Sequence, residues 1–174
     1  MARAKTRGPQ LDRIVLAGLT DADGSDLRAG DSREAERFTG CDLTGRDLTG
    51  IGLRECELRE VSLSDTQLRG ASVADCVAGE LHASVFSAPR SSWRDVSIEH
   101  SRLGSVELYE ATLRSVHIDG SKLDFVNLRG ATLTDVLLSN CIIEELDLGG
   151  ATVDDAQLSL LAPVLAAHLG IIVT

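Results

Sequence analysis

The chain has 174 residues, of which 43% are hydrophobic and 3% aromatic, and its formal net charge is −10. This length predicts a single domain, and the acidic balance disfavours direct binding to nucleic acid or to anionic membranes while favouring basic partner surfaces. No stretch approaches 18 consecutive apolar residues, and no long apolar segment follows the basic N-terminus. We therefore expect a cytoplasmic protein with neither a membrane span nor a signal peptide.

The first 37 residues are predicted to be a tail and an end cap. Residues 1–10 are basic and have the composition of a disordered tail. Residues 11–19 carry enough apolar side chains for a short strand or turn that covers the start of the following array. Residues 20–35 are rich in glycine and aspartate, which predicts a loop, with a helical turn near 31–36.

From residue 38 onward every fifth residue is apolar, and the frame does not slip. A period of five fits neither a helix nor an alternating strand. Two residues before each of these positions the side chain is usually small or β-branched. Two inward residues in every five predict short edges joined by tight corners, so that the chain winds as a coil and buries its inward residues against the next turn. The apolar series is Phe38, Leu43, Leu48, Leu53, Leu58, Leu63, Leu68, Val73, Ala78, Ala83, Ala88, Trp93, Ile98, Leu103, Leu108, Leu113, Ile118, Leu123, Leu128, Leu133, Leu138, Ile143, Leu148, Val153 and Leu158.

The two inward registers exchange sizes between residues 76 and 93. The apolar series shrinks to Ala78, Ala83 and Ala88, whereas the preceding inward positions grow to Leu81 and Phe86. Because protein interiors are close-packed, a small residue at one inward site needs a large one nearby. The exchange therefore predicts that both registers fill one shared interior.

The segments CDLTGRDLTG (41–50), ATLRSVHIDGSKLDFVNLRGATLTDVLL (111–138) and LDLGGATV (146–153) resemble the pentapeptide-repeat family. The resemblance implies an all-β fold, a right-handed, quadrilateral parallel β-helix in which four pentapeptides make one coil of 20 residues. Alanines at 71, 111, 131 and 151 give this sequence its own trace of that longer period. We expect the β-helix to span 38–154 in about six coils, stacked about 4.8 Å apart.

All four cysteines fall at the small inward register, where they are expected to be small buried side chains. Two of them would stack on neighbouring coils, which makes a Cys56–Cys76 disulfide conceivable. Free thiols are the expectation, because nothing in the sequence indicates secretion. The four are Cys41, Cys56, Cys76 and Cys141.

Residues 155–174 change to helical spacing and are predicted to cap the last coil. Asp154 or Asp155 is expected at the helix N-cap, Gly170 at the C-terminus, and Pro163 to kink or split the helix. The remaining apolar residues are expected to pair as a strand or to join two chains. Residues assigned to the cap and dimer contact are Leu158, Leu161, Val164, Leu165, Leu169, Ile171 and Ile172.

The sequence contains no motif for catalysis or for binding a metal or cofactor. Its four histidines lie at unrelated outward registers without HxxE or CxxC spacing, and neither a phosphate-binding glycine loop nor GxSxG is present. A solenoid with a dry interior also leaves little room for a cleft. We expect a protein that is not an enzyme and uses no cofactor or metal.

One outward column is acidic at a spacing of 20 residues, interrupted once by Ser115. Carboxylates stacked about 4.8 Å apart repel one another. Either these corners face water and simply tolerate acidic residues, or the column imitates the phosphates of duplex DNA. We name this column the acidic ladder and assign it to partner binding: Glu55, Asp75, Asp95, Asp135 and Asp155.

The family resemblance also implies a function. The quinolone- and fluoroquinolone-resistance members are acidic dimeric rods that imitate duplex DNA and occupy the DNA-binding saddle of DNA gyrase. For this chain the resemblance implies a homodimer that binds gyrase, or another DNA-binding protein such as a topoisomerase, and modulates it or protects it from inhibitors. The unbroken frame excludes the projecting loops of the enterobacterial type, which matter for protection there.

The alternative is a structural or scaffolding rod with an unidentified protein partner. Outward apolar residues would then form the contact patch, although scattered apolar residues are also common on protein surfaces. The candidate residues are Val85, Phe125, Leu137 and Ile142.

Overall fold

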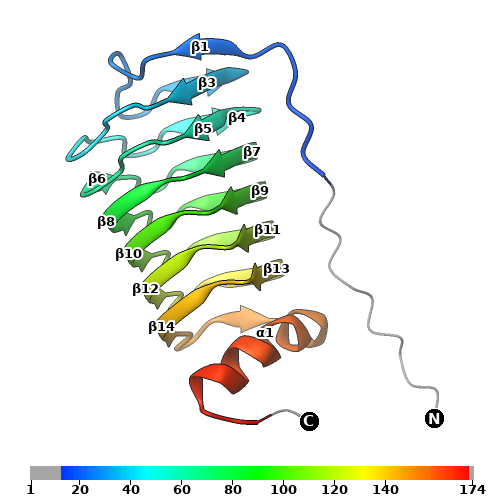
Figure 1. Ribbon diagram of the computed structural model, residues 1–174. Coiled ribbons are helices and arrows are strands. Elements are labelled where there is room, and N and C mark those ends of the chain that lie inside the picture. Colours follow the sequence, from blue (N-terminus) through cyan, green and yellow to red (C-terminus); the bar gives the residue numbers. More distant parts are fainter. Residues whose placement is uncertain (1–12, 173–174) are drawn as a thin grey trace.

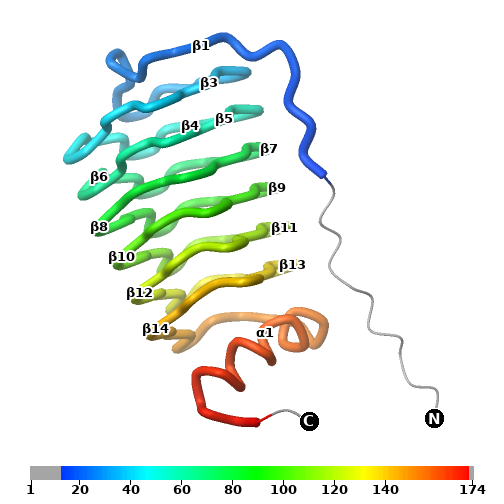
Figure 2. Tube along the Cα trace, viewed as in Figure 1, coloured from blue at the N-terminus to red at the C-terminus, as the bar shows by residue number. Residues whose placement is uncertain are grey.

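The computed structural model describes residues 13–172 and is a parallel β-solenoid of about seven turns with one C-terminal helix (Figure 1). The turns stack along a single axis, and the helix lies at the C-terminal end (Figure 2). The tail predicted for residues 1–10 lies outside the described residues. The elements are β1 (Thr20–Ala22), β2 (Ser32–Glu34), β3 (Glu36–Thr39), β4 (Gly52–Arg54), β5 (Glu57–Arg59), β6 (Thr66–Gln67), β7 (Ser72–Gly79), β8 (His82–Ser87), β9 (Ser92–Glu99), β10 (Arg102–Glu107), β11 (Thr112–Asp119), β12 (Lys122–Asn127), β13 (Thr132–Ser139), β14 (Ile142–Asp147), β15 (Thr152–Val153) and α1 (Asp155–His168).

Two parallel sheets form the walls of the solenoid. The larger follows the order β1-β3-β5-β7-β9-β11-β13-β15, with β2 and β4 beside this path, and the smaller follows β14-β12-β10-β8-β6. Paired residues lie 20 positions apart, as Leu113 and Leu133 do in the larger sheet and Leu103 and Leu123 in the smaller. The register therefore confirms the predicted coil of four pentapeptides.

The corners of a turn have left-handed backbone at intervals of five residues. In one turn the four corners are Glu55, Glu60, Asp65 and Gly70, with φ of 53°, 54°, 58° and 66°. Glycine adopts this conformation without strain, whereas most other residues are disfavoured there. The five-residue rhythm thus comes from the backbone as well as from the side chains.

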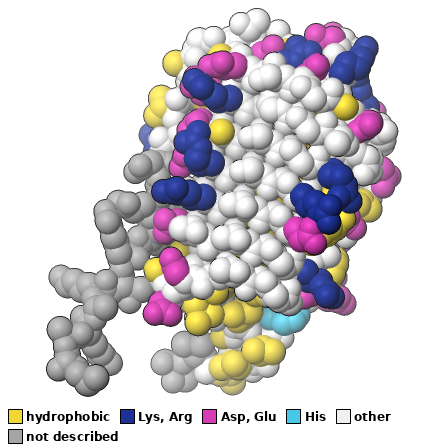
Figure 3. All heavy atoms as spheres, turned by 180° about the vertical axis from the view of Figure 1, so that it is seen from behind, with side chains coloured by type: hydrophobic (Ala, Val, Ile, Leu, Met, Phe, Trp, Pro, Cys, Tyr) yellow, Lys and Arg dark blue, Asp and Glu magenta, His cyan; other side chains and the backbone are white. Residues whose placement is uncertain are grey.

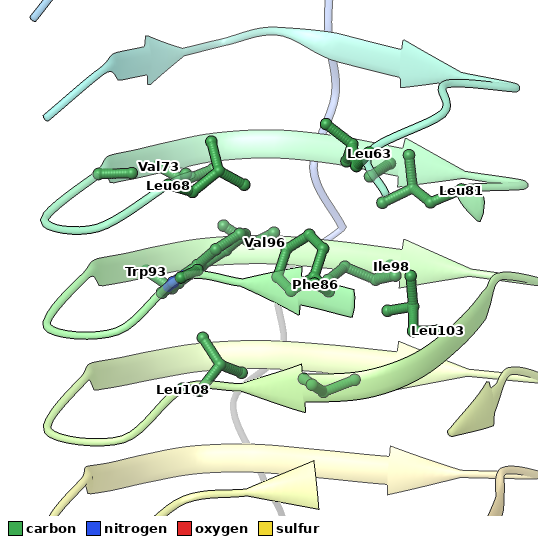
Figure 4. Packing of buried hydrophobic residues seen from close by; sticks show 14 of the residues in the cluster. Leu63, Leu68, Val73, Leu81, Phe86, Trp93, Val96, Ile98, Leu103 and Leu108 are labelled. Atoms are coloured by element: carbon green, nitrogen blue, oxygen red, sulfur yellow. The ribbon is translucent and has the colours of Figure 1, made fainter. Parts of the chain in front are cut away.

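The interior is filled by the predicted apolar series. Its members are buried or partly buried along the whole solenoid, and the exchange of sizes is confirmed, since Ala83 and Ala88 are buried beside Phe86. The rings of Phe86 and Trp93 lie 5.9 Å apart, centroid to centroid, within one turn (Figure 4). The prediction is wrong at Leu158, which lies on α1 with 51% of its surface exposed.

The small inward register is small because its side chains bond to the backbone of the adjoining corner. The Cys76 thiol donates to the carbonyl of residue 74 (3.1 Å), and the Ser101 hydroxyl donates to the carbonyl of residue 99 (2.9 Å). Ser101 Oγ also accepts from the backbone N–H of Leu81 in the preceding turn (3.0 Å). All four cysteines are free thiols, and the backbone N–H of Cys56 donates to Cys76 Sγ (3.4 Å).

The solenoid begins earlier than the sequence indicates. Residues assigned to a polar loop form β1 and β2, which pair with β3 and β4, and no helical turn forms at 31–36. The reason is a shorter first turn: Ala22 pairs with Phe38, 16 positions on instead of 20, so the five-residue frame is lost there. Leu27 is buried and supplies the apolar side chain for this end. The boundary at residue 37 and the count of six coils were therefore wrong.

The helix α1 closes the other end. Asp154 is its N-cap, with Oδ1 accepting from the backbone N–H of Gln157 (2.7 Å), and Gly170 follows the helix with φ of 68°. A single helix continues through Pro163, so the predicted split does not occur. A proline removes only one helical hydrogen bond, and packing of Leu161 on the last turn holds the helix in place.

Candidate functional site

The acidic ladder occupies one corner of the larger sheet. Glu55, Asp75, Asp95 and Asp135 have φ between 53° and 55°, and so does Ser115, which interrupts the column. Short polar side chains such as aspartate tolerate left-handed backbone better than most residues. Part of the acidic pattern thus follows from the corner conformation, independently of any partner.

The ladder is partly neutralised by arginines one residue away. Arg94 bonds to Asp75 (3.0 Å) and to Asp95 (3.1 Å), and Arg54 bonds to Glu55 (3.2 Å). Figure 3 shows basic and acidic side chains interleaved along both edges of one face of the molecule. Repulsion between stacked carboxylates is therefore relieved within the protein. The sequence analysis missed these ion pairs, although the arginines at 54 and 94 lie one turn-multiple apart in the sequence.

The ladder ends at Asp135 on this corner. Asp155, the fifth predicted member, is the first residue of α1 instead of a left-handed corner residue. A carboxylate in the first turn of a helix interacts favourably with the helix dipole, which gives Asp155 a local role. Within the described residues, Asp135 forms no ion pair, so it is the least compensated corner carboxylate.

The predicted cap and dimer residues divide into two groups. Leu161 is buried against the last turn, and Val164 and Leu165 are half-buried. The others face outward and leave apolar surface at the C-terminal end of the rod, where Figure 3 also shows hydrophobic side chains. Their exposed fractions are 51% for Leu158, 68% for Leu169, 56% for Ile171 and 87% for Ile172.

The predicted apolar patch is not brought together. Val85 and Phe125 are both half-buried, and Ser105 of the intervening turn separates them. Leu137 lies on β13 of the larger sheet, whereas Ile142 begins β14 of the smaller one. These residues therefore do not form one contact surface.

The model of the pentapeptide-repeat family matches eight copies of the repeat, at residues 37–72 and 121–159. Between the two ranges the strands β7, β9 and β11 pair in the same 20-residue register. The chain is a pentapeptide-repeat protein.

Solved structures similar to this pentapeptide-repeat protein include two of QnrB1, which is described as a plasmid-mediated fluoroquinolone resistance protein. A trypsin-treated form is 20% identical with a TM-score of 0.30, covering 90% of this chain and 100% of that one. The full-length form is 19% identical with a TM-score of 0.28, covering 83% of this chain and 94% of that one. A comparison with curated proteins gives no match.

One polar cluster on the pentapeptide-repeat solenoid was missed by the sequence analysis. The Ser139 hydroxyl donates to Asp119 Oδ1 (2.5 Å), Asn140 donates to the same oxygen (2.8 Å), and His117 Nε2 lies 2.6 Å from Ser139 Oγ. The hydrogen bonds from Ser139 and Asn140 lower the pKa of Asp119. The 20-residue register of β11 and β13 could have predicted that Asp119 and Ser139 are neighbours.

This cluster lacks the arrangement of a serine nucleophile. Because the Ser139 hydroxyl donates to Asp119, His117 Nε2 must donate to Ser139 Oγ. A nucleophilic serine needs the reverse, with its hydroxyl donating to the imidazole. The cluster instead ties β11 to β13 in neighbouring turns.

Metal binding and membrane crossing find no support in residues 13–172. There, no group of three His, Cys, Asp or Glu side chains is placed to hold a metal ion. In the same range, no helix combines the length and the apolar character that a membrane span requires.

Proposed function

We propose that this pentapeptide-repeat protein binds the basic DNA-binding surface of DNA gyrase, or of another topoisomerase, in place of duplex DNA, and so modulates the enzyme or protects it from inhibitors. The observation that carries the proposal is a carboxylate repeated once per turn on one corner of a stiff rod. Duplex DNA is also a rod of regularly spaced negative charge. The net charge of −10 favours encounter with a basic surface.

The ion pairs on the ladder are compatible with this role. Arg94, which is shared by Asp75 and Asp95, has 54% of its side-chain surface exposed. Exposed ion pairs contribute about 0–1 kcal/mol, so a partner's basic residues could displace Arg94 at small cost. In the free protein the same pairs would limit self-repulsion along the corner.

Replacing Asp75, Asp95 and Asp135 by asparagine should raise the concentration needed to affect gyrase supercoiling by about tenfold or more, because three charge-assisted contacts are lost. Asparagine tolerates left-handed backbone, so the corner conformation should persist. The measurement is supercoiling by purified gyrase at increasing protein concentration, at fixed salt.

The matched control is Asp42→Asn, Asp65→Asn, Glu145→Gln, which removes the same charge around the smaller sheet. Asp42 pairs with Ser62, Asp65 is itself a left-handed corner, and Glu145 lies on β14. This control should keep wild-type potency. Equal loss in both triple variants would reduce the effect to net charge, and no effect of the wild-type protein at high micromolar concentration would refute the gyrase proposal.

We also propose that two copies associate through the apolar C-terminal surface formed by Leu158, Leu169, Ile171 and Ile172. Exposed apolar surface of this kind is typical of protein contacts, and a two-fold axis would bury both copies of it at once. The partner in this proposal is a second copy because the surface lies at the end of the rod, away from the ladder.

The double variant Leu169→Asp, Ile172→Asp should sediment as a monomer at concentrations where the wild-type protein is a dimer. Val15→Asp is the control, because Val15 is 79% exposed and lies far from this end in the chain. A wild-type protein that stays monomeric at about 100 μM, a weak affinity for a stable dimer, would contradict the association.

A further inference from the structure

Residues 13–19, here named the N-terminal arm, run along the outside of the solenoid instead of covering its end. From β1 the arm passes down the side of the rod over the edges of successive turns (Figure 1). A groove of about 530 Å³ lies between the arm and the solenoid, lined on one side by Arg13, Ile14, Leu16 and Leu19. The opposite side includes residues of β3, β5, β7, β9 and β11. The prediction that 11–19 cover the first coil was therefore wrong for the described residues.

The arm contacts the solenoid through one of its two sides. Ile14 and Leu16 are half-buried, whereas Val15 and Ala17 between them are exposed, with 79% of Val15 accessible. This alternation is that of an extended chain lying on a surface. Seven extended residues span about 23 Å, which matches four turns at about 4.8 Å each.

The arm is held by side-chain contact alone. Within the described residues, the first backbone hydrogen bond at this end is from Thr20 N–H to the carbonyl of Ala35 (2.9 Å), after the arm has ended. Segments with few buried contacts and solvent-exposed backbone open at low free energy. The arm is thus built to leave the solenoid without disturbing the sheets.

The groove under the arm includes part of the acidic ladder. Asp95 and Ser115, which stack on the ladder corner, line it together with Glu57 and Glu99. Residues 1–13 hold four basic residues and one acidic residue, a charge of +3, which leaves −13 for the rest of the chain. The arm therefore places a basic segment beside the carboxylates that would face a basic partner.

We propose that the N-terminal arm is an intramolecular competitor, which occupies the ladder side of the solenoid and must be displaced before a basic surface can bind there. The proposal rests on the proposed function in taking a basic surface as the partner. Release of the arm would uncover Asp95 and its neighbours and remove the positive charge of Arg13 from them. The arm would thus set the affinity of the ladder without being part of it.

The test compares two variants of the full-length protein that have the same charge change. Ile14→Asp, Leu16→Asp places carboxylates on the side of the arm that touches the solenoid, and Val15→Asp, Ala17→Asp places them on the exposed side. NMR should show shifted amide resonances of Val77, Ser97 and His117, which line the groove, in the first variant only. Unchanged resonances in the first variant would show that the arm is not held there, and would overturn the proposal.

The second measurement uses a fluorescent peptide of nine arginines as the basic probe. The Ile14, Leu16 variant should bind it several-fold more tightly than the Val15, Ala17 variant at the same salt concentration. Equal affinities would overturn the competition. Because gyrase is absent from both measurements, a failure of the gyrase proposal would leave this result standing, and the reverse also holds.

Discussion

Replacing Leu128 by aspartate is expected to unfold the solenoid. Leu128 is 3% exposed and stacks between Leu108 and Leu148 in the interior column. An unpaired carboxylate there must be desolvated or protonated, and either costs several kcal/mol. Domains of this size have about 5–15 kcal/mol of stability in total, so most of it would be lost. Circular dichroism and size-exclusion chromatography should show loss of β-structure and aggregation.

Ile142→Asp is the control for that experiment. Ile142 is 63% exposed and pairs in register with Lys122, so a carboxylate there remains hydrated and close to a cation. Its thermal unfolding should resemble that of the wild-type protein. A soluble Leu128→Asp protein with a wild-type cooperative melt would contradict the inward assignment of the apolar series.

The interior could be predicted from the sequence because each inward position is specified locally. A residue such as Leu103 must be apolar whatever lies in the other turns, since it always faces the same axis. Left-handed corners every five residues reinforce the same frame from the backbone. The pattern therefore survives even where side-chain sizes are exchanged, as at Ala83 and Phe86.

The ends could not be predicted in the same way, because there the frame changes. The first turn is 16 residues long where Ala22 pairs with Phe38, so an apolar period of five no longer marks it. At the other end Leu158 keeps the five-residue spacing by coincidence, but it lies on a helix and faces outward. A terminal turn has a neighbour on one side only, which relaxes the demand for apolar centres.

The candidate site was predicted as a column of residues and not as a set of contacts. The register alone placed Asp75 above Asp95, and the structure agrees. The share of Arg94 in both carboxylates depends on how a long side chain turns at the corner, which spacing does not determine. The arm beside the ladder was also invisible, because residues 13–19 carry no repeat that relates them to a wall of the solenoid.

Replacing Gln157 by leucine is expected to lower the free energy of unfolding by about 2–4 kcal/mol, because two buried backbone groups lose their partner. Gln157 is 1% exposed, its Oε1 accepts from Val136 N–H (2.6 Å), and its Nε2 donates to the Val136 carbonyl (2.8 Å). The side-chain amide thus takes the place of a further strand at the end of β13. Urea denaturation at neutral pH measures the loss, and the melting temperature should fall by roughly 5–15 °C.

Two further variants separate hydrogen bonding from volume. Gln67→Leu changes an exposed glutamine of β6 and should stay within about 0.5 kcal/mol of wild type. Gln157→Glu keeps the shape and the acceptor but loses the donor when ionised. Burial raises the pKa of such a carboxyl in the folded state, so the folded protein binds the proton more tightly and stability should recover as the pH falls from 7 towards about 5. Equal losses in Gln67→Leu and Gln157→Leu would mean that α1 closes the solenoid through apolar packing alone, without the bonds of Gln157 to β13.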